Sequence, residues 1–63
     1  MEQARLMTLI DEAITLLEKR YDRLPTPLEV QTYLYAEYSV VEPLESVRRI
    51  GDDVLDLRNK VEE

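Results

Sequence analysis

The stretch Leu24-Pro25-Thr26-Pro27-Leu28-Glu29 divides the chain and decides its fold. Thr26 precedes a proline and stands three residues before a glutamate, which is the pattern of a helix-capping box with proline at the first helical position. A new helix therefore begins at Pro27, and any helix before it ends before Pro25. We predict that the new helix is short and runs from about Pro27 to Tyr38.

The segment from about Glu2 to Arg23 has the residue spacing of a long helix. Its apolar residues recur every three or four positions and form two adjacent stripes. The first stripe contains Met7, Ile10, Ile14, Leu17, Tyr21 and Leu24, and the second contains Leu6, Leu9, Ala13 and Leu16. Because the two stripes cover a wider arc than one partner helix needs, this helix is predicted to pack against two neighbours.

A third helix is predicted from about Pro43 to Val61, since proline again suits the first helical position. Its apolar residues form one narrow stripe: Val47, Ile50, Val54, Leu57 and Val61. Gly51 lies inside this segment and weakens a helix by about 1 kcal/mol relative to alanine. The stripe keeps its phase across the glycine, so we predict one continuous helix.

The short second helix is predicted to bury one arc and to expose Tyr33 on the opposite side. The predicted buried arc consists of Leu28, Val30, Leu34, Tyr35, Tyr38 and Val41. Tyr33 lies outside it, together with Glu29 and Glu37. Exposed tyrosine is enriched at protein interfaces. We therefore predict that these three side chains contact another protein.

Together these segments predict an all-α fold, a three-helix chain in long-short-long order that forms a helical bundle as a single domain over residues 1–63. A chain of about 60 residues has a marginal core, and one short helix offers little cover for two long apolar stripes. We expect a homodimer to complete the bundle. Its seam is predicted to be the second stripe, Leu6, Leu9, Ala13 and Leu16, and the spacing of Asp53 and Arg58 permits an ion pair between the two chains.

The composition argues against most kinds of chemistry. The chain has 14 acidic and 8 basic residues, a net charge of −6, and no histidine or cysteine. It therefore offers neither an imidazole base nor a thiol nucleophile, and neither disulfides nor the usual zinc sites can form. We expect no enzymatic activity, no cofactor and no metal. No apolar run approaches the length of a membrane span, and the absence of cysteine favours the cytoplasm.

The function expected from these observations is that of a small acidic regulator that acts by binding another protein. A nucleic-acid-binding protein is the alternative, with the start of the third helix as the recognition element. In that case Ser46, Arg48 and Arg49 face the nucleic acid. An acidic mimic of nucleic acid that inhibits a DNA-binding protein is a further alternative, which the net charge permits.

The stretch from Leu24 through Leu34 resembles the helix opening common in sigma-factor region 3 and other helix-turn-helix domains. This resemblance implies the nucleic-acid alternative. The sequence departs from the motif at residues 35–41, which stand in place of its tight glycine-bearing turn. In addition, no lysine or arginine occurs from Leu24 to Val47, so the predicted second helix is negative and nucleic acid is an unlikely partner on electrostatic grounds.

Overall fold

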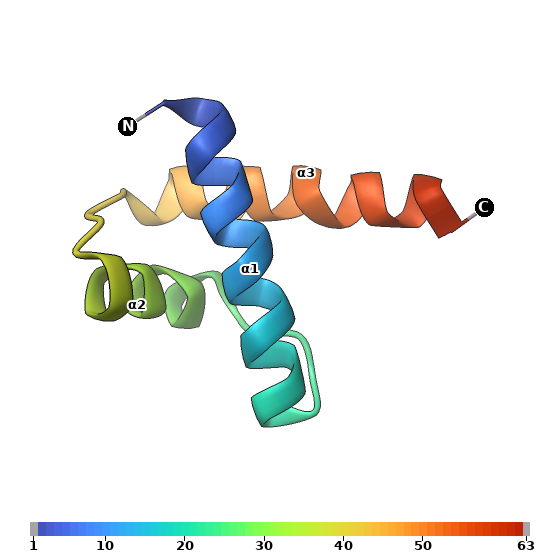
Figure 1. Ribbon diagram of the computed structural model, residues 1–63, viewed down its shortest axis with the longest axis horizontal. Coiled ribbons are helices and arrows are strands. Elements are labelled where there is room, and N and C mark those ends of the chain that lie inside the picture. The colour runs from blue at the N-terminus through green and yellow to red at the C-terminus, as the bar shows by residue number, and fades with distance from the viewer. Residues whose placement is uncertain (1, 63) are drawn as a thin grey trace.

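Three helices in the predicted long-short-long order make up the fold (Figure 1). The computed structural model describes the backbone of residues 2–62 and the side chains of residues 2–60. The helices are α1 (Gln3–Tyr21), α2 (Pro27–Tyr38) and α3 (Leu44–Glu62), and each packs against the other two. In Figure 1, α1 crosses over α3, and the C-terminal half of α3 projects beyond both other helices.

The start of α2 forms by local hydrogen bonding, as the sequence predicts. The Glu29 backbone N–H donates to the Thr26 hydroxyl oxygen over 3.2 Å, and the Thr26 backbone N–H donates to the Glu29 carboxylate over 2.8 Å. Pro27 occupies the first helical position, where its missing N–H has no cost. This reciprocal pair satisfies two backbone donors and confirms the predicted capping box.

The end of α2 is closed by a left-handed residue. Ser39 has a φ of 56°, and its N–H donates to the Tyr35 carbonyl over 3.0 Å. The next N–H, of Val40, donates to the Leu34 carbonyl over 3.2 Å. These two bonds satisfy carbonyl groups that the helix leaves open, and the bond from Ser39 to Tyr35 is the one that defines an αL cap. The chain therefore turns sharply after α2 and leads directly into α3.

The core lies where the three helices meet. Half of its side chains come from α1, which contacts both other helices, as predicted. The buried apolar side chains of the described residues are Leu6, Ile10, Ala13, Ile14, Leu17, Val30, Leu34, Val47, Ile50 and Val54. On α1 they are drawn from both predicted stripes, because α2 and α3 cover adjacent parts of its surface.

The predicted dimer seam on α1 is partly used inside the single chain. Leu6 and Ala13 are buried in the core, Leu9 is half-buried against it, and only Leu16 is exposed. The expectation that this stripe lies open in one chain is therefore wrong for Leu6 and Ala13. The physical reason is that α3 crosses α1, which leaves room for α2 to cover the neighbouring part of the same helix.

The predicted buried arc of α2 is also wrong in part. Val30 and Leu34 are buried as expected, but the other four are exposed: Leu28 (59%), Tyr35 (64%), Tyr38 (40%) and Val41 (78%). Tyr33, which was expected to be exposed, is half-buried and packs against the core. Apolar residues occur on all sides of α2, so the orientation of this helix follows from its fit between α1 and α3.

Gly51 lies within a continuous α3, as predicted, and has no positive φ to preserve. A Cβ atom at this position would lie 3.9 Å from Ile14 Cδ1, which is ordinary van der Waals contact. We therefore expect Gly51→Ala to stabilise the fold by about 1 kcal/mol through helix propensity. Urea denaturation followed by circular dichroism measures this change. A lower midpoint for Gly51→Ala would contradict the prediction.

Candidate functional site

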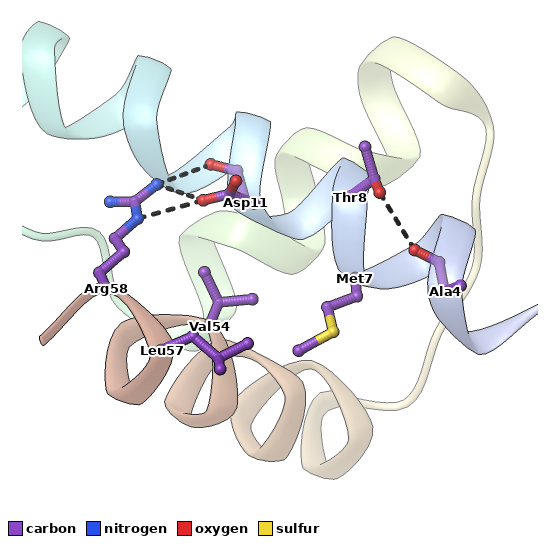
Figure 2. A pocket seen from close by; sticks show the side chains of 7 residues that line it. All are labelled: Ala4, Met7, Thr8, Asp11, Val54, Leu57 and Arg58. Atoms are coloured by element: carbon purple, nitrogen blue, oxygen red, sulfur yellow. Dashed lines mark hydrogen bonds and ion pairs between the residues drawn. The ribbon is translucent and has the colours of Figure 1, made fainter. Parts of the chain in front are cut away.

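A groove lies between the N-terminal half of α1 and the C-terminal half of α3. It has a volume of about 470 Å³. Its lining consists of Ala4, Met7, Thr8 and Asp11 from α1 and of Val54, Leu57 and Arg58 from α3 (Figure 2). We call these seven residues the α1–α3 groove. Figure 1 shows that α1 and α3 cross and then diverge, and residues from both helices line the groove.

The middle of the groove is apolar. Figure 2 shows Met7, Val54 and Leu57 lying between the two helices. Val54 is buried and Met7 half-buried, whereas Leu57 is 51% exposed. Methionine adapts its shape readily to a partner surface. The groove is therefore suited to receive an apolar side chain from another molecule.

An ion pair forms one end of the groove. Arg58 Nε donates to the Asp11 carboxylate over 3.1 Å, and Arg58 Nη2 donates to the Asp11 backbone carbonyl over 3.2 Å. Nη2 also contacts the Asp11 carboxylate and the Thr15 hydroxyl. The spacing of Arg58 and Asp53 permits a pairing between two chains, but within the single chain the Arg58 guanidinium group is bound to α1. These bonds tie α1 to the projecting half of α3.

The three side chains predicted to contact a partner do not act together in the structure. Glu29 caps α2 and forms a two-point ion pair with Arg23, with both nitrogen–oxygen distances at 2.9 Å. Tyr33 packs edge-to-face on Tyr38, with ring centroids 6.1 Å apart. The pKa of Tyr38 is raised, mainly by partial burial and in smaller part by the neighbouring Tyr33. Glu37 alone of the three is fully exposed.

The ion pair holds Glu29 in its charged form. Hydrogen bonds from the Arg23 side chain and then from the Thr26 backbone lower the pKa of Glu29 from 4.5 to about 2. Arg23 also lies over the Tyr21 ring, 5.0 Å from its centroid. The bonds from Arg23 and Thr26 thus join the end of α1 to the start of α2. The sequence predicted the cap but not the arginine that reinforces it.

A pH dependence of stability follows from the lowered pKa of Glu29. A carboxylate whose pKa is lower in the folded state stabilises that state above its unfolded pKa, and the effect is lost as the pH falls from about 4.5 to about 2. We expect Glu29→Gln to lower the melting temperature at pH 6 and to differ much less from the wild type at pH 2. Glu18→Gln on the exposed face of α1 is the control. An equal difference at both pH values would refute the role of Glu29.

The residues of the nucleic-acid alternative lie near the start of α3. Arg48 and Arg49 are exposed, and Ser46 is half-buried. Arg48 also lines a small hollow of about 80 Å³ together with Asp52 and Leu55. The structure thus places the two arginines at the surface, and their contact with nucleic acid stays a prediction.

The α1–α3 groove was missed in the sequence, although part of its signal was present. Met7 and Leu57 each belong to a predicted apolar stripe, but the stripes alone do not show where the helices diverge. Among residues 2–60, no three carboxylates gather closely enough to hold a metal ion. No helix in the described part of the chain is long and apolar enough to cross a bilayer. The chain matches no protein-family model, no curated protein and no solved structure.

Proposed function

We propose that this protein is a non-catalytic helical interaction module that pairs with itself and binds another protein. The observation that carries the proposal is the α1–α3 groove, a hollow of about 470 Å³ whose apolar lining includes the exposed Leu57. Concave, mostly apolar surface with a few polar groups at its edge is the usual form of a binding site. Regulation by such a protein consists of occlusion or recruitment of its partner.

A second copy of this chain is the proposed occupant of the groove. The C-terminal half of α3 projects beyond the other helices and carries Leu57 (Figure 1). In a two-fold arrangement the same patch serves both copies, so Leu57 of each chain enters the groove of the other. The ten buried apolar side chains of the described residues form a small core, which association would enlarge.

The oligomeric state tests this part of the proposal. We expect light scattering at high micromolar concentration to give twice the 7.4 kDa mass of one chain. Leu57→Arg is expected to give the single-chain mass, because it places a charge in the apolar groove. Leu44→Arg, an exposed leucine on the same helix outside the groove, is expected to leave the dimer intact. A wild-type mass of 7.4 kDa at that concentration would overturn the dimer.

Ionic strength gives a second readout of the same pairing. Each chain carries a net charge of −6, so two copies repel one another. Added salt screens this repulsion. The proposed dimer is therefore expected to tighten as salt rises, whereas a dimer held by ion pairs between copies would weaken.

The partner-binding surface is proposed on the outer face of α2 instead of the Tyr33 side. Tyr35 and Val41 are exposed there, whereas Tyr33 packs inward. A pull-down with tagged protein tests the function. A partner retained by the wild type and by Leu16→Ala, but lost with Tyr35→Ala, is the expected result. Retention of every captured protein by Tyr35→Ala would exclude this surface.

A further inference from the structure

A second hollow lies between the outer face of α2 and the connection that follows it. Its volume is about 250 Å³, and it is lined by Gln31, Thr32, Tyr35, Val40, Val41 and Glu42. We call these six residues the α2 hollow. It is separate from the α1–α3 groove, with which it shares no lining residue.

The walls of the α2 hollow are held in place from within. Gln31 Nε2 donates to the Glu42 backbone carbonyl over 2.8 Å, which ties the helix to the connection. Val40 packs against the core, and its N–H closes the end of α2. Gln31, Val40 and the Glu42 backbone are therefore held in place without a partner, which lowers the entropic cost of binding.

The rim of the α2 hollow is apolar and exposed. Val41 and Tyr35 are the two most exposed large apolar side chains of the described residues. Among residues 2–60, the aromatic and cation–π contacts involve the rings of Tyr21, Tyr33 and Tyr38. The Tyr35 ring takes part in neither kind of contact. The exposed Tyr35 ring and the exposed Val41 side chain thus both line the α2 hollow.

Among its six lining residues, the α2 hollow has one charged residue, Glu42, which is negative. From Leu24 to Val47 the chain has four glutamates and no lysine or arginine. Glu29 is neutralised by Arg23, but Glu42 takes part in neither ion pair found among residues 2–60. A carboxylate beside an uncovered aromatic ring attracts a cation and repels phosphate or an acidic segment.

We propose that the α2 hollow binds an arginine side chain presented by an amphipathic segment of a partner protein. The aliphatic part of that arginine packs on Val40 and Val41, its guanidinium group lies over the Tyr35 ring, and Glu42 supplies the counter-charge. Arginine suits this site better than lysine because its guanidinium is planar, less strongly hydrated and stacks on aromatic rings. The inference rests on the proposed partner-binding function and names the chemistry of the partner.

Model peptides test this site directly. A labelled amphipathic helical peptide of leucine, alanine and arginine is titrated with the protein, beside matched peptides in which lysine or glutamate replaces every arginine. We expect the arginine peptide to bind most tightly, the lysine peptide more weakly and the glutamate peptide not at all. Binding is expected to weaken as salt rises, opposite to the salt dependence of the dimer.

Variants connect the binding to the α2 hollow. Glu42→Gln and Tyr35→Leu are each expected to weaken the arginine peptide by about fivefold, the size of a partly desolvated cation–π contact or ion pair. Glu42→Gln leaves the backbone carbonyl that holds Gln31 unchanged. Glu18→Gln and Tyr21→Leu on α1 are the matched controls, with affinity expected to remain as in the wild type. Circular dichroism verifies that each variant is folded.

Two outcomes would overturn the arginine site. One is the absence of arginine-peptide binding by the folded wild type at millimolar protein. The other is binding that Glu42→Gln and Tyr35→Leu leave unchanged. Either result is distinguishable from failure of the proposed function, because partner binding is read from the pull-down with Tyr35→Ala and self-association from the mass of the Leu57→Arg variant, both without any peptide.

Discussion

Leu34→Ala is expected to unfold most of the protein at room temperature. Leu34 is 0% exposed and lies on α2, which packs against both α1 and α3. Truncating a fully buried leucine to alanine costs about 2–5 kcal/mol, from lost burial and the cavity left behind. The core of a domain this small rarely supplies more than about 3–5 kcal/mol in total. One substitution therefore removes most of the stability of the fold.

The measurement is the helical signal in far-ultraviolet circular dichroism, followed against urea at low protein concentration. Low concentration matters because the proposed self-association would stabilise the folded state by mass action. Leu28→Ala is the matched control, since Leu28 is the same residue type on the same helix but is 59% exposed. We expect that control to change stability by about 0.5 kcal/mol or less. Equal effects of the two substitutions would contradict the observed orientation of α2.

Ala13→Leu is expected to destabilise the fold by about 1–3 kcal/mol through overpacking. Ala13 is 0% exposed within the core, where a larger side chain has no room without moving a helix. Thermal denaturation measures the effect as a lower melting temperature. Ala36→Leu is the matched control, because Ala36 is an exposed helical alanine on α2.

Ala13→Leu also distinguishes a position in the core of one chain from a position in a seam between two copies. A core position loses stability on enlargement, whatever the state of association. A seam position between two copies instead changes the mass measured by light scattering and leaves the single chain stable. A stable Ala13→Leu protein with altered association would restore the seam predicted from the sequence and contradict the burial of this residue.

Local signals in the sequence determined the helices and their ends. The Thr26–Glu29 cap and the prolines act within a few residues, through hydrogen bonds and backbone restrictions that need no tertiary contact. The continuity of α3 through Gly51 followed from the spacing of its apolar residues. The predicted all-α, long-short-long order was correct for the same reason.

The sequence did not determine which face of α2 turns inward. Tyr33 and Tyr35 lie two positions apart, on opposite sides of a helix with apolar residues on every side, and the apolar spacing favoured the wrong one of the two for burial. The packing of α2 against α1 and α3 determines which face of α2 is buried, and it leaves Tyr35 exposed. This orientation also moved the proposed partner contact from the Tyr33 side to the α2 hollow.

By itself, then, the sequence determined where the three helices begin and end, that they are amphipathic, and that the surface between Leu24 and Val47 is negative. The tertiary structure alone decided how α1 crosses α3, and with it the α1–α3 groove and the pairing of Arg58 with Asp11 across 47 positions of chain. The reason is the separation, along the sequence, of the residues that interact. Helix formation depends on neighbours three or four residues apart, whereas a crossing depends on how distant side chains fill a shared core.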